Sequence, residues 1–376
     1  MEDKCILHIS NDYSGSTVYK NLVAQLDTLE QAQQVYTAIR SSKLIDKNSI
    51  GFKNKSSKII YRKILTLYTR VNYKAKIQRI FKDIQGEIDI SNVKIVHAHT
   101  WYSDGGVAYE LFKRYKIPYI VAVRNSDTKV FYKYLVHLRG YGINILKHAS
   151  KIIFISSHNY QRVLHVLPGF QSELRKKSIV IPNGIDKYWL EHVSKRKTKK
   201  EEVAQLIFVG KVSKNKNILN TCRAVHALSL SGVKLNLTII GDKGDAWNDV
   251  SKFVKDKPIF KYLGTIWSKE TLRRYFLASD LFIMPSISET FGLVYIEALS
   301  QGIPVIYTKN QGIDGFYDRS VGEAVHANSI KSIVEGISRI ILNYANYDFS
   351  PEVIVQNHDW SIIAKKYKQI YDSILI

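Results

Sequence analysis

The chain has 376 residues, of which 45% are hydrophobic and 23% charged, and its formal net charge at pH 7 is +22. This length suffices for two ordinary domains, and the composition is that of a globular rather than a disordered protein. The two cysteines, Cys5 and Cys222, exclude a disulfide framework or a cysteine-based metal site, so a reducing cytosol is the simplest compartment.

The positive charge is concentrated in the first half of the chain. Residues 1–186 hold 29 Lys and Arg against 14 Asp and Glu, and the remainder holds 26 against 19. Nucleic acid and anionic membranes are the usual partners of such a surface. A lysine-rich genome composition would give the same excess without a function, and this alternative stays open.

The N-terminal half is predicted to alternate strands and helices, which indicates an α/β fold with parallel sheets. Residues 1–4 lead into a strand rather than a signal peptide, and no apolar run reaches the roughly 18 residues of a membrane span. A helix should begin near Thr17, after a loop in which Gly15 allows close approach of a ligand. Short apolar runs predict strands at Cys5–Ile9, Ile95–Ala98, Tyr119–Val123, Ile152–Ile155 and Ser178–Ile181.

Residues 43–82 form the most basic segment, with 12 Lys and Arg and a single acid, Asp46. Its apolar residues recur near helical spacing and predict a basic amphipathic helix. Such a helix either lies on an anionic membrane surface or packs on its own domain with a solvated basic face. The residues of the stripe are Ile60, Ile64, Leu67 or Tyr68, Val71, Ile77, Ile80, Phe81 and Ile84.

Polar residues follow three of the predicted strands. His99 ends one strand; we place His97 on the opposite strand face and give it a structural role. Arg124, Asn125 and Asp127 follow the next strand and indicate either a contact with the acceptor or donor of a reaction or an ion-paired loop. Asn183 lies in a Pro-Asn-Gly turn, which either contacts a ligand or is simply a turn.

A second α/β unit is predicted after a polar run. We divide the chain into a first domain at 1–186, a linker at 187–204, a second domain at 205–357 and a C-terminal helix at 358–376. Trp360, Ile363 and Tyr367, with Ile370 or Tyr371 and Ile374, give that helix its apolar face. The predicted strands of the second domain are Leu206–Val209, Leu235–Ile240, Ile259–Tyr262, Leu281–Met284 and Val305–Tyr307.

Glu289 and Glu297 stand eight residues apart, where a strand passes through a loop into a helix. Free N–H groups at a helix start bind anions or hydroxyl groups, and a carboxylate among buried neighbours needs donors such as sugar hydroxyls. A helix acid that complements the macrodipole, with one exposed acid, is the structural alternative. Lys211 and Lys216 follow the first strand of the second domain; they are either phosphate ligands or solvated loop lysines.

Five segments in order resemble glycosyltransferase family 4, whose members are retaining enzymes with the GT-B fold. Residues 289–297 match its Glu-x7-Glu motif, residues 97–99 its His-x-His, and residues 182–186 its Pro-Asn-Gly-Ile-Asp. Residues 209–216 match a Val-Gly-Arg-Leu segment followed by a Lys, with Lys211 in place of Arg, and residues 238–241 match a strand that ends in Gly. The loop at Gly15 departs from the double glycine of the family.

The resemblance implies two Rossmann-like domains that face a central cleft, with a C-terminal helix that crosses back to the first domain. It implies that His99 contacts the donor sugar near the reacting carbon, that Glu289 binds sugar hydroxyls and that Glu297 binds the nucleotide ribose. Lys211 and Lys216 would hold the diphosphate. The remaining donor-binding positions are Gly15, Asn183, Gly210, Gly241, Ile266, Phe291, Gly292 and Leu293.

The expected function is hexosyl transfer from a nucleotide sugar, UDP- or GDP-linked, to a glycan or lipid-linked acceptor in bacterial envelope polysaccharide synthesis. No metal cofactor is expected, because Asp245 and Asp249 lack Asp-x-Asp spacing and the two lysines can replace the ion. We expect a cytoplasmic enzyme, peripheral at the inner face of the membrane. The alternatives are a nucleotide-sugar 2-epimerase of the same fold and a basic nucleic-acid-binding protein, although no nucleic-acid motif occurs.

Overall fold

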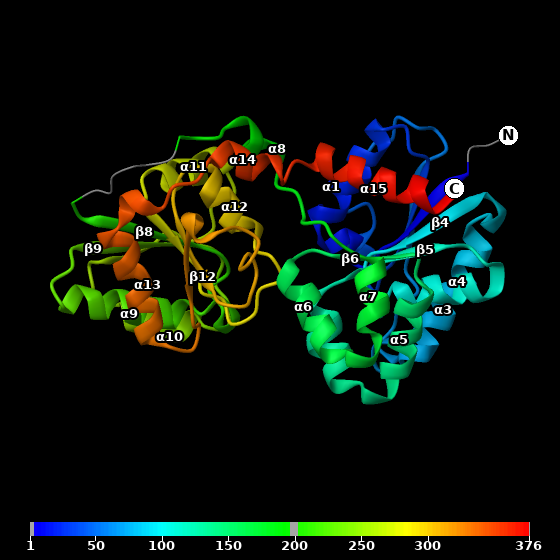
Figure 1. Cartoon of the computed structure of the whole chain (residues 1–376), viewed down its shortest axis with the longest axis horizontal. Coiled ribbons are helices and arrows are strands. Elements are labelled where there is room, and N and C mark those ends of the chain that lie inside the picture. Colours follow the sequence, from blue (N-terminus) through cyan, green and yellow to red (C-terminus); the bar gives the residue numbers. More distant parts are fainter. Residues whose placement is uncertain (1–3, 196–201, 376) are drawn as a thin grey trace. The chain divides into compact units, whose positions relative to one another are not determined.

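The computed structural model describes residues 4–195 and 202–375. It divides into two compact units: unit one comprises residues 1–183 and 360–376, and unit two comprises residues 184–359. Each unit is built on one parallel sheet covered by helices (Figure 1). No helix among the described residues has the length and apolar character to cross a bilayer.

Unit one contains a seven-stranded sheet in the order β3-β2-β1-β4-β5-β6-β7, with every pairing parallel. The five strands predicted for this half are present with ends that shift by at most two residues. Strands β1 and β5 are buried at every position, as expected for a parallel sheet covered on both faces. The strands are β1 (Cys5–Ile9), β2 (Gln33–Ala38), β3 (Lys58–Arg62), β4 (Val93–Ala98), β5 (Tyr119–Val123), β6 (Lys151–Phe154) and β7 (Ser178–Val180).

Two helices from opposite ends of the chain cover one face of this sheet. Helix α1 (Thr17–Thr28) packs beside α15 (Trp360–Leu375), and the C-terminal helix therefore returns to unit one, as predicted (Figure 1). Trp360, Ile363, Tyr367 and Tyr371 are buried in this layer. The other face is covered by α3 (Tyr73–Glu87), α4 (Gly105–Tyr115), α5 (Arg139–His148), α6 (Ser157–Val166) and α7 (Gln171–Lys177).

The prediction of one amphipathic helix across residues 43–82 is wrong. Ile60 lies in strand β3, and helical structure begins only with the short α2 (Tyr68–Val71), followed by α3. The Asn72 side chain accepts a hydrogen bond from the Ala75 N–H and so starts α3 as a separate helix. Ile77, Ile80 and Ile84 are buried against the sheet, so the apolar stripe of α3 packs on its own domain.

Unit two contains a six-stranded parallel sheet in the order β10-β9-β8-β11-β12-β13. Its strands are β8 (Ala204–Val209), β9 (Leu235–Ile240), β10 (Phe260–Tyr262), β11 (Leu281–Ile283), β12 (Val305–Thr308) and β13 (Gly322–Val325). Its helices are α8 (Lys187–Glu191), α9 (Ile218–Leu230), α10 (Trp247–Val254), α11 (Lys269–Leu277), α12 (Leu293–Ser300), α13 (Ile330–Leu342) and α14 (Pro351–Gln356).

The segment predicted as a linker begins as folded structure. Helix α8 places the Trp189 ring against Phe276, with ring centroids 5.7 Å apart, and Trp189 is 1% exposed. Residues 196–201 of the predicted linker lie outside the described residues.

Candidate active site

In unit two, Lys216 and Glu289 come together from two different strand ends. Lys216 ends a single 3-10 turn after β8, and Glu289 lies in the loop after β11. The Lys216 Nζ lies 2.5 Å from Glu289 Oε2, and the Thr290 N–H donates to Glu289 Oε1 at 3.1 Å. Both side chains retain some exposure, 25% for Lys216 and 13% for Glu289. The pair therefore presents a fixed positive and a fixed negative group at the carboxyl edge of the sheet, where parallel sheets bind ligands.

The loop from Glu289 enters α12 through Gly292. Gly292 has a φ of +82°, and a Cβ there would lie 2.5 Å from the Tyr295 ring, so a larger residue would displace that ring. No side chain within the described residues caps α12, which leaves the first N–H groups of the helix available to a ligand. Phe291, beside Gly292, is buried, and Leu293 begins the helix. These three predicted donor-binding positions are therefore contiguous with the Lys216–Glu289 pair.

Glu297 lies one turn further along α12 and is partly buried, between the fully buried Ile296 and Ala298. Burial raises the pKa of Glu297 to about 7, and the negative charge of Asp186 adds to this shift. Lys269 and a hydrogen bond with Trp189 act in the opposite direction. A carboxylate in this setting is stabilised when a ligand brings further hydroxyl donors.

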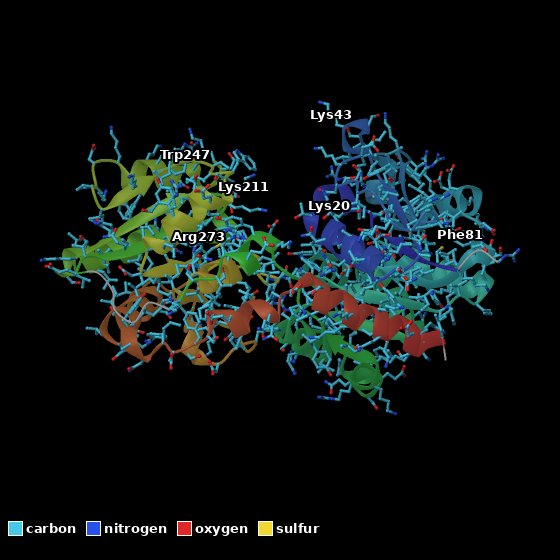
Figure 2. All side chains as sticks on the ribbon, turned by 90° about the horizontal axis from the view of Figure 1, so that it is seen from above. Lys20, Lys43, Phe81, Lys211, Trp247 and Arg273 are labelled. Atoms are coloured by element: carbon cyan, nitrogen blue, oxygen red, sulfur yellow. The ribbon has the colours of Figure 1, made fainter. Side chains whose placement is uncertain are left out.

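The glycines predicted at the ends of β8 and β9 adjoin one another. The Gly210 N–H donates to the Ile240 carbonyl at 2.9 Å, and a Cβ on Gly241 would lie 1.9 Å from the Gly210 carbonyl oxygen. Gly241 has a φ of +148°, so the close approach of these two chains requires glycine there. Lys211 follows Gly210 with an exposed side chain (Figure 2), and Ile266 lies partly buried in the loop after Gly264.

Three histidines form a buried cluster in unit one. His97 and His99 share the same face of β4, with ring centroids 4.0 Å apart, so the placement of His97 on the opposite face is wrong. Residues two apart along a strand point to the same side of the sheet. His8 Nδ1 lies 3.0 Å from His99 Nε2, and His97 Nδ1 lies 2.8 Å from the Tyr371 hydroxyl of α15. Burial lowers the pKa of all three, that of His8 to about 3, so the rings are neutral at pH 7.

The polar residues after β5 hold this edge of unit one together. The Asp127 carboxylate accepts hydrogen bonds from the backbone N–H groups of Trp101, Tyr102 and Arg124, at 2.8 to 3.1 Å, and burial raises its pKa to about 6. The Arg124 Nε donates to the His99 carbonyl at 3.1 Å. Asp127 thus holds the loop after β4 in place, and Arg124 links that loop to the histidine cluster. Contact of these residues with a donor or an acceptor stays a prediction.

Asn125 follows β5, Gly15 ends a 3-10 turn after β1, and Asn183 follows β7. Asn125 is partly buried and its carbonyl accepts from the Thr128 hydroxyl. Gly15 lies in the loop after β1, where its N–H donates to the Asp12 carbonyl. Asn183 follows β7 and is the last residue of this stretch of unit one.

Sequence reasoning did not single out Asp104 or His8. Asp104 is buried next to the start of α4, accepts from the Asn11 N–H, and has a pKa that burial raises to about 7. Its place in a polar loop between a strand and Gly105-Gly106 could have drawn attention to it. His8 interrupts an apolar strand, and a polar residue at a core position is the signal that could have marked it.

Metal-compatible geometry occurs once within residues 4–195 and 202–375. The ligand atoms of His8, His97 and His99 lie within 4.8 Å of one another. This cluster lies in the core of unit one, beneath α15. Metal-independent transfer stays a prediction.

Two family models match the chain over adjoining ranges. Residues 17–188 match Glycosyltransferase Family 4, and residues 191–358 match Glycosyl transferases group 1. The chain belongs to this family of glycosyltransferases, as the motifs predicted.

Relatives and a solved structure agree with the assignment. The chain is 26% identical to the putative teichuronic acid biosynthesis glycosyltransferase TuaC of Bacillus subtilis, over 65% of this chain and 60% of that protein. It is 25% identical to alpha-monoglucosyldiacylglycerol synthase of Acholeplasma laidlawii, over 60% of this chain and 61% of that protein. The chain therefore spans about three-fifths of the length of each relative. Sucrose-phosphate synthase from Thermosynechococcus elongatus aligns with a TM-score of 0.75 at 17% identity, over 99% of each chain, which confirms the GT-B fold.

Proposed function

We propose that this protein is a retaining glycosyltransferase that moves a hexose from a UDP- or GDP-linked donor to a glycan or lipid-linked acceptor in bacterial envelope polysaccharide synthesis. The observation that carries the proposal is the Lys216–Glu289 pair at the open start of α12, one turn before Glu297. The teichuronic acid and glycolipid enzymes among the relatives support the envelope setting.

Each residue of the donor site has a role that its chemistry supports. Lys211 and Lys216 neutralise the diphosphate as it leaves, because fixed positive charge stabilises the negative charge that develops there. Glu289 accepts hydrogen bonds from hydroxyls of the transferred sugar and Glu297 from the ribose. The N–H groups of Phe291, Gly292 and Leu293 approach the sugar and phosphates. Gly210, Gly241 and Ile266 flank the nucleotide, and Gly15, Asn183 and His99 act from unit one.

Retention follows from a front-face displacement in which the leaving phosphate accepts the proton of the acceptor hydroxyl. The new glycosidic bond then forms on the face from which the diphosphate departs. The neutral state of His99 suits a contact with the donor sugar rather than a proton transfer at pH 7. We place the enzyme in the cytoplasm, at the inner face of the membrane, where a basic surface meets anionic lipid.

The test is a transfer assay with a panel of nucleotide sugars and envelope lipid extract. We expect one donor to release its nucleoside diphosphate and to give a product with the anomeric configuration of the donor. A product of inverted configuration would contradict the proposed stereochemistry. Release of a free epimeric sugar without an acceptor would identify a 2-epimerase instead.

A further inference from the structure

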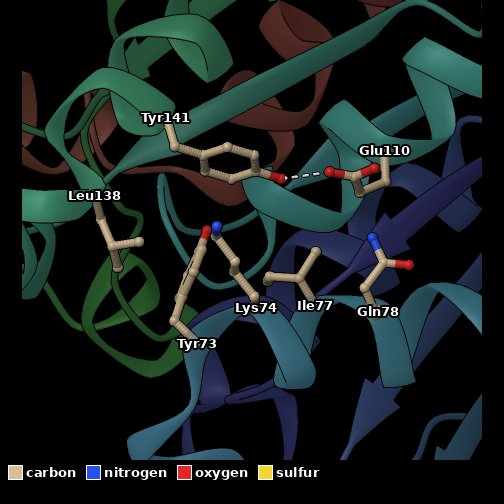
Figure 3. A pocket seen from close by; sticks show the side chains of 7 residues that line it. All are labelled: Tyr73, Lys74, Ile77, Gln78, Glu110, Leu138 and Tyr141. Carbon is tan, nitrogen blue, oxygen red and sulfur yellow. Dashed lines mark hydrogen bonds between the residues drawn. The ribbon is translucent and has the colours of Figure 1, made fainter.

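An apolar groove opens on the helical face of unit one, beside the start of α3. One part, of about 310 Å³, is lined by Tyr73, Lys74, Ile77, Gln78, Glu110, Leu138 and Tyr141 (Figure 3). A second part, of about 370 Å³, shares Tyr73, Lys74 and Leu138 with the first and is also lined by Tyr68, Val71, Asn72 and His137. The two parts therefore adjoin.

Large apolar side chains of the lining, and of residues next to it in the chain, are in contact with water. Leu67, Tyr68 and Val71 are 78%, 61% and 82% exposed, and Tyr134 and Val136, from the segment that leads to His137, are 66% and 59% exposed. A single exposed apolar residue is ordinary, but a cluster around an apolar cavity marks a binding surface.

The charge around the groove is positive. Residues 68–74 and 133–139 contain no Asp or Glu, and they carry Arg70, Lys74, Lys133 and Arg139 in addition to His137. The acid in the lining, Glu110, is already engaged, because it accepts from the Tyr141 hydroxyl at 2.7 Å and pairs with Lys113 at 2.9 Å (Figure 3). An occupant with an apolar body and an anionic head complements this combination.

The groove is joined to the loop after β4, which belongs to the candidate site. The Tyr73 hydroxyl donates to the Tyr102 carbonyl at 2.8 Å, and Lys76 Nζ lies 2.8 Å from the Ser103 hydroxyl. The same loop is held by Asp127 and begins at His99. The first turns of α3, which line the groove, are thus hydrogen-bonded to the loop that begins at His99.

We propose that this groove binds the hydrocarbon chain of a lipid-linked acceptor, with the acceptor phosphate against Lys74 and Arg70. The inference rests on the proposed function and deepens it, because it selects a lipid phosphate over a free glycan as the acceptor class. The exposed apolar residues then contact the membrane that holds the hydrocarbon chain of the acceptor. Helix α3 contributes its first turn to the site, while its apolar stripe stays buried in the core.

The direct test is calorimetric titration of the full chain with decyl phosphate below its micelle concentration. Decyl maltoside, which has the same chain and a neutral head, and inorganic phosphate are the comparison ligands. We expect decyl phosphate to bind about tenfold more tightly than decyl maltoside and inorganic phosphate to show no saturable binding, because both the chain and the charge contribute. Equal binding of both amphiphiles, or none of decyl phosphate, would overturn the proposal.

Matched variants locate the site. The Tyr68→Ser/Val71→Ser double variant and Lys74→Glu should each weaken decyl phosphate binding about tenfold or more. Leu342→Ser, which replaces a side chain 80% exposed on unit two, and Lys255→Glu, an exposed lysine there, should leave it unchanged. All of these positions are exposed, so the fold should survive. Unaltered binding in the groove variants would contradict the assignment.

Three further results separate this inference from its rivals. Binding to anionic vesicles without binding of monomeric decyl phosphate would show that the surface meets a bilayer and not a single chain. A dimer that Val71→Ser dissociates in sedimentation would assign the groove to a second copy. Nucleoside diphosphate binding, measured in the same variants, should be unchanged. If the wild type binds decyl phosphate but no nucleoside diphosphate, the proposed glycosyltransferase function is contradicted, whereas the groove is supported as a site for an anionic amphiphile.

Discussion

At the scale of single residues, the donor site depends on charges that hold one another in place. Lys216 and Glu289 come from separate strand ends and meet at 2.5 Å, so each fixes the geometry of the other before any ligand arrives. Partial burial makes the loss of one partner costly, because the remaining charge is left without its counterpart. When a donor binds, Glu289 can accept hydrogen bonds from sugar hydroxyls and Lys216 can bind phosphate, in place of part of their contact with each other.

Lys216→Met should lower the rate of sugar transfer by about 10²- to 10³-fold, because it removes positive charge that stabilises the leaving diphosphate in the transition state. The change should appear mainly in kcat, measured by nucleoside diphosphate release at saturating donor. Lys255→Met, an exposed lysine of the same unit, is the control and should be unchanged. A Lys216→Met enzyme with wild-type kcat would remove this residue from the leaving-group site.

Glu297→Gln should stabilise the ligand-free protein at pH 8 while weakening nucleotide binding. The pKa of Glu297 is raised to about 7 from 4.5, so the folded state binds its proton more tightly than the unfolded state does. Ionisation of Glu297 therefore lowers the free energy of unfolding as the pH rises from 4.5 to 7. Above pH 7 the loss levels off at about 3 kcal/mol. Urea unfolding at pH 5 and pH 8 measures this, and the gain should be larger at pH 8. Equal stability of variant and wild type at both pH values would contradict the buried environment.

The donor-side candidates can be named from the sequence because their motifs are local, and their roles stay predictions. Glu289 and Glu297 lie on one short segment, and Phe291, Gly292 and Leu293 lie between them. The role of Asp104, by contrast, depends on the Asn11 N–H, 93 residues away in sequence. For Asp127 the sequence leaves a ligand contact and an ion-paired loop open, because no local pattern shows that three backbone N–H groups converge on its carboxylate.

At the scale of elements, β2, β3 and β13 are not among the strands predicted from the sequence, and β2 is a strand with polar residues at buried positions. Gln33 and Thr37 of β2 are buried, and the Gln33 amide donates to the Val23 carbonyl. Such a strand lacks the apolar run by which the others were found. The error at residues 43–82 has a related cause, because Ile60 and Ile64 fit helical spacing by chance across a strand and a loop. Hydrophobic spacing alone does not separate these cases.

The buried histidine cluster links β1, β4 and α15, and its imidazole rings are neutral in the folded protein. His8 has a pKa of about 3 in the folded protein against 6.5 as its ordinary value, and burial also lowers the pKa of His97 and His99. Because the unfolded chain takes up these protons first, stability is complete above pH 6.5 and falls as the pH decreases below it. Each histidine contributes a slope of about 1.4 kcal/mol per pH unit in that range.

We therefore expect the urea midpoint of unit one to fall steeply between pH 6.5 and pH 5. His8→Leu should make this fall shallower by the slope of one proton, even if its stability at pH 7 is lower. His326→Asn, at an exposed position of unit two, should leave the slope as it is. A wild-type pH slope in the His8→Leu variant would show that His8 titrates normally.

At the scale of the whole molecule, two parallel sheets of similar design carry different chemistry. The acids and lysines of unit two form the candidate donor site, and unit one carries the buried histidines and the basic groove. Two α/β units could be predicted from the sequence because strands and motifs recur along nearly the whole chain. The groove could not, because it is assembled from residues 68–78, 110 and 137–141, which share no motif.

Transfer should persist in the presence of EDTA if, as proposed, Lys211 and Lys216 supply the positive charge that a divalent ion supplies in other glycosyltransferases. The measurement compares the transfer rate without EDTA and with EDTA in large excess over trace metal. Loss of activity in EDTA with recovery in Mg²⁺ or Mn²⁺ would assign the leaving-group role to a metal.

The central claim is that unit two binds a nucleoside diphosphate through Lys216 and Glu297. Calorimetric titration of the full chain with UDP, GDP and ADP tests this most directly. We expect saturable binding of one of them, weakened about tenfold or more by Glu297→Ala and by Lys216→Met, with Lys255→Met unchanged. Absence of binding for every nucleotide, or equal binding by all four proteins, would contradict the account.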